Sequence, residues 1–271
     1  MSSNVQAIIL ALIQGLTEFL PVSSSAHLIL LPKLLKWQDQ GLAFDVAIHV
    51  GTLCAVIWYF RHELKLMLVD WSKSIFSQKT NKNARLTWAI GFGTIPVGLS
   101  GLLLHNYIAS QMRATWIIAV TTIAFGILLG ITSVIAKQTR SEYSVTWRDV
   151  LIIGCAQALS LIPGTSRSGI TLTAGLFVGL TRTAAARYSF LLSIPVILLA
   201  GGLECYKLYT AETVIAYQPL LLGFVTAAIS GYLCISLFLR LLDKYGVMPF
   251  VIYRIILGIL LLYVFGINSS M

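Results

Sequence analysis

The sequence predicts an all-α polytopic membrane protein, and three observations support this fold class. The 271 residues are 57% hydrophobic and only 11% charged, with a mean hydropathy of +0.85, which is too apolar for a soluble domain of this size. Apolar runs long enough to cross a bilayer recur along the chain. Basic residues gather in the loops between these runs. We therefore expect residues 1–271 to form a single integral membrane domain with no separate soluble domain.

Six apolar runs approach the length of about 20 residues that a spanning helix needs. They cover residues 42–60, 86–104, 115–136, 184–203, 220–239 and 248–265. Two further apolar regions, 5–35 and 150–180, are interrupted near the middle by proline and a cluster of small hydroxyl residues. We interpret each of these regions as a re-entrant helical hairpin, which enters and leaves the membrane on the same side.

The distribution of basic residues supports the two hairpins. If the loop 61–85 is cytoplasmic, strict alternation assigns most of the Lys and Arg to the same side. These are Arg61, Lys65, Lys73, Lys79, Lys82, Arg85, Lys137, Arg140, Arg148, Arg182, Arg187, Arg240 and Lys244, whereas Lys33, Lys36, Arg113 and Lys207 fall outside. A crossing by either hairpin would move the later loops to the other side. The net charge of +9 thus reports topology, and no nucleic-acid partner is expected.

The same assignment gives the two hairpins opposite orientations, which predicts an inverted-topology repeat. The first repeat covers about residues 1–136 and the second about 145–271. Residues 14–21 followed by VSSSAH resemble residues 157–163 followed by GTSRSG, although the second copy is one residue shorter before its proline. Later spans carry Thr-Ile-Pro ending at Pro96 and Ser-Ile-Pro ending at Pro195. Opposed hairpins of this kind bring their two tips together near the membrane midplane.

The chemistry at the two tips predicts an anion site. A helix that begins at the serines after Pro21 directs its unpaired N–H groups and its positive dipole end towards the interruption. The second tip repeats this arrangement and adds Arg167, whose planar guanidinium suits phosphate oxygens. Glu18 fits beside an anion only if a divalent cation, Mg²⁺ or Ca²⁺, lies between them. Gln14 lies four residues before Glu18 and shares its helix face.

Simpler explanations compete with these assignments. A serine after a helix-breaking proline is more often a cap than a nucleophile. Ionisable residues inside membrane segments favour function, which applies to Glu18, His27 and Arg167. Asp45 and His49 either pair with each other across one helix turn or belong to the site, and both interpretations stay open.

Other features have simpler expectations. Arg254 is expected to snorkel from the last span to the interface. The GxxxG patterns at 126–130 and 175–179 are expected to pack helices. The four cysteines, Cys54, Cys155, Cys205 and Cys234, lie singly, without C-x-x-C spacing, and are expected to be buried small residues.

The two tip motifs and their neighbours resemble a known family. QGLTEFLPVSSSAH, PGTSRSG, FDVAIHVGT and FLLSIP are similar to segments of the undecaprenyl-diphosphate phosphatases, the bacitracin-resistance membrane phosphatases of bacteria. The resemblance covers nearly the whole chain. It implies hydrolysis of undecaprenyl diphosphate to the monophosphate and inorganic phosphate, which recycles the lipid carrier for peptidoglycan and confers bacitracin resistance. The expected location is the bacterial cytoplasmic membrane, with the substrate entering from the outer face.

The resemblance also implies roles for individual residues. Ser24 matches the nucleophile, Arg167 the phosphate-binding arginine and His27 the histidine three residues after the nucleophile, a general base or orienting group. The metal ligands would be Glu18 and Gln14, where many members have a second Glu instead of Gln14. The residues around the tips that we expect to bind the substrate are Ser23, Ser25, Gly164, Thr165, Ser166 and Ser168. Direct attack by water, with Ser24 only binding phosphate, is the alternative mechanism.

A second class of function is also compatible with the architecture. Inverted repeats with broken helices at the midplane are typical of secondary transporters, so a carrier or flippase of a polyprenyl phosphate is the alternative. A hydroxyl beside a histidine and a carboxylate favours the enzyme, because a carrier needs an anion cradle but no nucleophile. The expected partners are the polyprenyl diphosphate and the surrounding lipid, and the sequence leaves a homodimer open.

Overall fold

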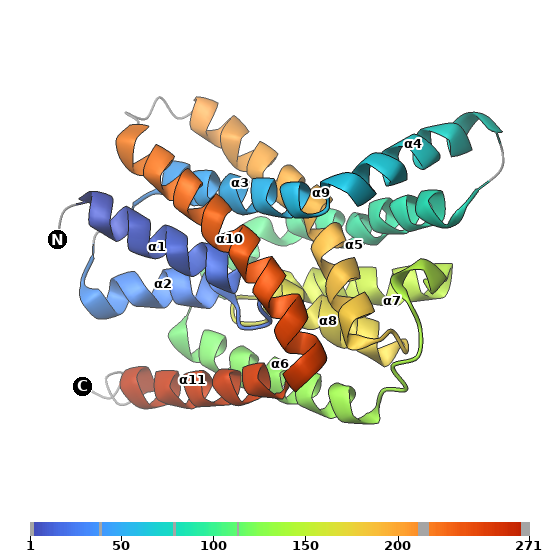
Figure 1. Ribbon diagram of the computed structural model, residues 1–271. Coiled ribbons are helices and arrows are strands. Elements are labelled where there is room, and N and C mark those ends of the chain that lie inside the picture. The colour runs from blue at the N-terminus through green and yellow to red at the C-terminus, as the bar shows by residue number, and fades with distance from the viewer. Residues whose placement is uncertain (1–2, 38–39, 78–79, 113, 211–216, 267–271) are drawn as a thin grey trace.

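The computed structural model describes residues 3–37, 40–77, 80–112, 114–210 and 217–266, and this part of the chain is almost entirely helical (Figure 1). The elements are α1 (Ser3–Thr17), α2 (Ser24–Leu35), α3 (Leu42–Tyr59), α4 (Arg61–Ser77), α5 (Lys82–Gln111), α6 (Thr115–Ile135), η1 (Glu142–Ser144), α7 (Trp147–Ala158), η2 (Leu159–Leu161), α8 (Arg167–Phe177), α9 (Arg182–Thr210), α10 (Tyr217–Tyr245) and α11 (Met248–Gly266). Within these ranges the only strand-like pairing is an isolated bridge between Arg140 and Leu180.

Six helices are long and apolar enough to cross a membrane, namely α3, α5, α6, α9, α10 and α11, which confirms the predicted spans. Helices α9 and α10 extend several residues beyond the predicted ranges 184–203 and 220–239. The apolar run marks only the part of a helix that lies in hydrocarbon, and the helix continues where polar residues follow. The chain is a multi-pass membrane protein.

Both interrupted regions have the helix–break–helix form that the prolines and serines predict. Helix α1 ends at Thr17 and α2 begins at Ser24, and α7 with η2 ends at Leu161 before α8 begins at Arg167. Helix α1 of the first predicted repeat packs against α10 of the second, and α7 of the second packs against α5 of the first. An inverted repeat would produce this reciprocal pairing. The re-entrant placement and the repeat boundaries stay predictions.

The two Ile-Pro motifs do not hold equivalent places in this order of helices. Pro96 lies in α5, after α3 and α4, whereas Pro195 lies in α9, the first long helix after the second interruption. Local sequence similarity matched the prolines because both lie inside long apolar helices, but the packing partners of a helix depend on distant segments.

Helix α4 lies in a segment that the sequence analysis treats as a loop. Residues 61–85 connect two predicted spans, but Arg61–Ser77 form a helix that packs along α5. Met67 is buried in this contact, the rings of Trp71 and Trp88 lie 5.7 Å apart, and Asn83 donates a 2.6 Å hydrogen bond to Asp70. The basic residues Arg61, Lys65 and Lys73 are exposed on the other face, so the mean hydropathy of the segment concealed the amphipathic helix.

Ion pairs tie together the segments on the predicted cytoplasmic side. Arg187 of α9 bridges Glu63 of α4 at 2.5 Å and Glu142 of η1 at 2.7 Å. Arg140 pairs with Asp149 at 2.6 Å, beside the capping box that Thr146 and Asp149 form at the start of α7. Lys79 and Arg113, to which the charge count gave opposite sides, lie outside the described residues.

An aromatic cluster anchors the first interruption to the core. Phe19, fully buried in the break after α1, meets the ring of Phe190 of α9 edge to face at 5.4 Å between centroids. Phe60 and Phe238 lie against the same ring at 6.5 and 5.8 Å. Burying these aromatic rings fixes the backbone on either side of Phe19, including the neighbouring Glu18.

The expectations for the four cysteines and the two GxxxG patterns are met only in part. Cys234 is buried, but Cys54, Cys155 and Cys205 are exposed, because in a membrane protein the outer surface of a span is itself apolar and accepts such residues. Gly126 and Gly130 pack α6 against α11, as the first GxxxG pattern predicts. The second pattern is not a helix-packing motif, since Gly179 lies beyond the end of α8 with φ +91°.

Candidate active site

A cavity of about 460 Å³ lies where the two interruptions meet. Serines 23–25 and Glu18 enter it from the first interruption, and Pro163, Ser166 and Arg167 enter it from the second. Its remaining wall consists of mostly apolar residues of α3, α5 and α9. The structure therefore brings the two tips together, as the opposed hairpins predict.

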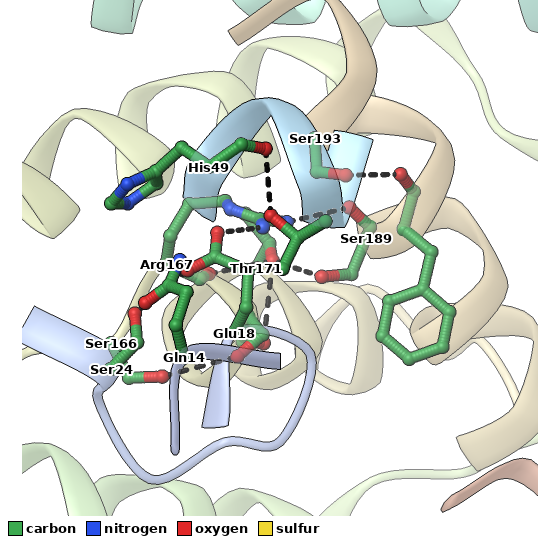
Figure 2. Close-up of polar contacts among 12 residues, drawn as sticks. Gln14, Glu18, Ser24, His49, Ser166, Arg167, Thr171, Ser189 and Ser193 are labelled. Carbon is green, nitrogen blue, oxygen red and sulfur yellow. Dashed lines mark hydrogen bonds and ion pairs between the residues drawn. The ribbon is translucent and has the colours of Figure 1, made fainter. Parts of the chain in front are cut away.

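Glu18 is the centre of the polar contacts in this cavity (Figure 2). Its Oε1 accepts a 2.9 Å charge-assisted hydrogen bond from Nη2 of Arg167. Its Oε2 accepts from Oγ of Ser24 at 2.8 Å and from Nε2 of Gln14 at 3.0 Å. The Arg167 and Glu18 side chains are only 11% and 8% exposed. One buried carboxylate thus links a hydroxyl of the first interruption to the guanidinium of the second.

Arg167 is held by main-chain and hydroxyl groups of α8 and α9. Its Nη1 donates to the main-chain oxygen of Ser189 at 3.2 Å, and the hydroxyls of Ser189 and Thr171 lie 2.6 Å apart (Figure 2). Ser166 caps α8 by accepting from the Gly169 N–H at 3.1 Å. The bonds to Ser189 and Glu18 fix the direction of the guanidinium. Ser189 and Thr171 lacked any local sequence signal, because their role depends on the packing of α8 against α9.

A second link between the interruptions lies behind the cavity. Ser168 Oγ donates to the main-chain oxygen of Leu20 at 2.7 Å and contacts Ser166 Oγ at 3.2 Å. Of the residues expected to bind substrate, Ser23, Ser25 and Ser166 line the cavity, whereas Gly164, Thr165 and Ser168 do not. Gly164 has φ +91°, and a Cβ there would lie 2.2 Å from Thr121 Oγ1, so this position requires glycine.

His27 directs its side-chain hydrogen bonds to groups other than Ser24. Its Nδ1 donates to the main-chain oxygen of Ser23 at 2.7 Å, which leaves Nε2 to accept from the Tyr253 hydroxyl at 2.5 Å. The two rings stack with centroids 5.8 Å apart. The Ser24 hydroxyl is hydrogen-bonded to Glu18, at 2.8 Å, and not to His27. The role of His27 stays a prediction.

Comparison with known proteins assigns the family. The model of the family described as "Bacitracin resistance protein BacA" matches residues 7–260. The chain belongs to this family. The undecaprenyl-diphosphatase of Thioalkalivibrio sulfidiphilus is 58% identical over 261 residues, which cover 96% of this chain and 98% of that protein. Undecaprenyl-diphosphatase 2 of Stutzerimonas stutzeri is 56% identical over 265 residues, which cover 97% and 98% of the two chains.

In this BacA-family chain the two residues expected to hold a cation, Glu18 and Gln14, are hydrogen-bonded to each other. Oε1 of Gln14 is fully buried and has no hydrogen-bond partner in the described part of the chain, although Nε2 of the same amide donates to Glu18. An unsatisfied amide oxygen next to a carboxylate is the donor chemistry that Mg²⁺ and Ca²⁺ accept. The described residues contain no group of three or more His, Cys, Asp or Glu that could hold an ion.

Asp45 and His49, for which pairing and a place in the site were both left open, line the cavity. Nδ1 of His49 donates to the main-chain oxygen of Asp45 at 2.7 Å. This bond ties the imidazole to the preceding turn of α3, and His49 is drawn beside the Glu18 cluster in Figure 2.

Arg254 is the residue that the sequence interpretation placed incorrectly. It was expected to snorkel to the interface, but its side chain is fully buried beneath the two interruptions and donates to four main-chain oxygens. Snorkelling requires a free path to the interface, whereas α6 and the two breaks enclose this guanidinium.

Proposed function

We propose that this chain hydrolyses undecaprenyl diphosphate to undecaprenyl phosphate and inorganic phosphate. The observation that carries the proposal is the chain of contacts from the Ser24 hydroxyl through Glu18 to Arg167, inside one cavity and across both interruptions. A hydroxyl bonded to a carboxylate, beside a guanidinium, is an arrangement for transferring a phosphoryl group. The names of the similar proteins agree with this activity.

The diphosphate head would bind between the two tips. Arg167 supplies a fixed cation, and α2 and α8 begin at Ser24 and Arg167 with their N-termini at the cavity. The first turn of each helix leaves N–H groups without intrahelical acceptors, and these groups bind anionic oxygens. Phosphate oxygens would compete with Glu18 for Arg167, which frees the carboxylate to act on Ser24.

Ser24 would attack the terminal phosphorus in line with the leaving group. The bond from Oγ to phosphorus forms, the bond from this phosphorus to the bridging oxygen breaks, and undecaprenyl phosphate leaves. Glu18 accepts the hydroxyl proton because its Oε2 already accepts that hydrogen bond at 2.8 Å. Water then hydrolyses the phosphoserine and regenerates Ser24. In the alternative mechanism, Glu18 activates this water directly and Ser24 only binds phosphate.

A divalent cation held by Glu18 and Gln14 would neutralise charge on the diphosphate oxygens and reduce the barrier to attack by the nucleophile. The orphaned amide oxygen of Gln14 supports this assignment.

The apolar part of the cavity would hold the first isoprene units of the lipid. Val97 and Gly101 of α5 and Val196, Ala200 and Gly201 of α9 line it together with the polar groups. A cavity of this size holds a diphosphate and a short apolar segment, so the rest of the chain would extend into the bilayer.

Two adjacent glycines test this placement. A Cβ at Gly201 or at Gly202 would meet no atom within 4 Å, but only Gly201 lines the cavity. Gly201→Leu is therefore expected to raise KM for a long prenyl diphosphate by about 10-fold or more, which corresponds to a loss of about 1.4 kcal/mol of binding free energy. Gly202→Leu is the matched control and should leave KM unchanged. Equal KM values for the two variants and the wild type would contradict the placement of the lipid against this wall.

The membrane setting completes the proposal. The six spans and the similarity to bacterial proteins support a location in the bacterial cytoplasmic membrane, and the positive-inside count supports a site reached from the outer face. The released undecaprenyl phosphate would there re-enter the cycle that carries cell-wall precursors, and faster recycling would oppose bacitracin.

The test is phosphate release by the purified protein in detergent from a long-chain prenyl diphosphate, with and without a chelator. Wild type should release phosphate, Ser24→Ala and Arg167→Ala should lose at least about 100-fold in kcat, and the exposed Ser72→Ala should match wild type. Wild type that binds the lipid but releases no phosphate with any cation would contradict the enzyme and favour the carrier.

A further inference from the structure

Arg254 of α11 is the largest fully buried side chain in the described part of the protein. Its Nε donates to the main-chain oxygen of Thr122 at 3.1 Å and its Nη1 to that of Pro21 at 3.3 Å. Its Nη2 donates to the main-chain oxygens of Gly164 and Thr165 at 3.0 and 2.9 Å. Four of the five guanidinium N–H groups therefore go to backbone carbonyls.

These carbonyls belong to both interruptions. Pro21 lies in the break after α1, Gly164 and Thr165 lie in the break before α8, and Thr122 belongs to α6. A guanidinium is planar and its donors have fixed directions, so one side chain determines the relative position of three backbone segments. Lysine could not reproduce this, since its three donors radiate from a single nitrogen.

The two breaks share an unusual backbone conformation that needs such support. Ser23 and Ser166, the residues before α2 and α8, have φ values of 73° and 70°. Left-handed conformations of residues other than glycine persist only where the surroundings enforce them. Arg254 binds the carbonyl two residues before Ser23 and the carbonyl immediately before Ser166. It thus holds the backbone that directs both helix N-termini at the cavity.

Glycines on α8 and α6 make space for the Arg254 side chain. A Cβ on Gly169 would lie 2.7 Å from Nη1 of Arg254, and a Cβ on Gly126 of α6 would lie 3.0 Å from Cβ of Arg254. Both glycines allow Arg254 to approach the backbone. The final glycine of the PGTSRSG segment thus has a steric explanation that the sequence alone did not provide.

The charge of Arg254 is balanced by no ion pair within the described residues. Carbonyl dipoles solvate it, and it does not line the cavity. An uncompensated cation in a low-dielectric interior favours an anion nearby, and the diphosphate head is the anion that the cavity would receive.

We propose that Arg254 is a positioning residue, which sets the register of the two interruptions and so places Ser24 and Glu18 against Arg167. The inference rests on the proposed phosphatase activity. It requires that loss of the guanidinium fork reduces turnover in protein that remains folded and still binds the lipid head.

The test compares Arg254→Lys, Gly169→Ala and their double variant with Gly202→Ala, whose added methyl enters open space. For each we would measure kcat, KM, the dissociation constant of a non-hydrolysable diphosphate lipid analogue, and thermal unfolding in detergent. Arg254→Lys keeps the charge, so we expect affinity within about 3-fold of wild type and kcat about 100-fold lower, as for a misplacement on the order of 1 Å. Gly169→Ala, which pushes the fork aside, should lower kcat by about 10-fold.

The double variant distinguishes displacement of Arg254 from a direct effect on the Ser166 cap. If Gly169→Ala acts through Arg254, the double variant is no slower than Arg254→Lys alone. Wild-type kcat in both single variants, with only the unfolding temperature lowered, would overturn the proposal in favour of a purely structural role. Should Arg254→Lys fail to fold, the kcat of Gly169→Ala decides alone. Inactive wild type would instead contradict the phosphatase.

Discussion

Replacing Glu18 by Gln separates the two roles that its contacts allow. The carboxylate accepts three hydrogen bonds, from Arg167, Ser24 and Gln14. An amide of the same shape retains one acceptor oxygen and turns its nitrogen towards a donor, so at least one of these contacts is lost. The substitution also leaves the Arg167 guanidinium, which is 11% exposed, without its counter-charge.

The magnitudes follow from these contacts. Loss of one charge-assisted hydrogen bond and of the ion pair should lower the free energy of unfolding by about 2–3 kcal/mol, less than for a fully dry pair because the cavity admits water. Loss of the proton acceptor for Ser24 should lower kcat by about 100- to 10,000-fold. Because Arg167 is then unpaired, a diphosphate lipid analogue should bind at least as tightly as it does to wild type in the absence of a divalent cation.

The assay is phosphate release at saturating lipid together with equilibrium binding of the analogue, both with and without a chelator. Weaker binding of the analogue to Glu18→Gln only when a divalent cation is present would assign Glu18 to the metal as well. A kcat within about 3-fold of wild type would refute the role of Glu18 as the proton acceptor.

Two further predictions concern residues outside the central cluster. Tyr253→Phe removes the hydroxyl that binds Nε2 of His27 and so frees the imidazole to turn. We expect kcat to fall about 5-fold, which corresponds to the loss of one hydrogen bond of about 1 kcal/mol. Tyr263→Phe, on the exposed side of α11, is the control and should leave kcat unchanged. Burial raises the pKa of Asp149, but hydrogen bonds from Arg140 and Thr146 outweigh this and hold the pKa below its ordinary value. The stability that Asp149 contributes is therefore full above the unfolded-state pKa of about 3.9 and lost as the pH falls through the folded-state pKa. Thermal unfolding from about pH 5 downwards should depend less on pH in Asp149→Asn than in wild type, and equal slopes would contradict the assignment.

The six spans and the two helix breaks could be predicted because the bilayer imposes local rules on the sequence. A span needs a minimum apolar length, and a proline followed by serines ends one helix and begins another. The polar groups Glu18 and Arg167 were conspicuous for the same reason, since hydrocarbon makes each of them costly.

Contacts between distant segments could not be derived in this way. Arg254 lies on α11, and nothing in its neighbourhood in the sequence indicates that it reaches Pro21 and Gly164. The direction of His27 depends on the left-handed backbone of Ser23, which sets the starting phase of α2 and turns the ring towards Tyr253. Helical spacing from Ser24 alone could not account for that phase.

The central claim is that the two interruptions form one catalytic site, and its most direct test is the coupling between Ser24 and Arg167. Single-turnover rates of phosphate release would be measured at high enzyme concentration for Ser24→Ala, Arg167→Gln and the double variant. Residues that act on the same phosphoryl group should be strongly non-additive, so the double variant should be about as slow as the slower single variant. A loss in the double variant equal to the product of the two single losses would mean that the residues act independently, which contradicts a shared site.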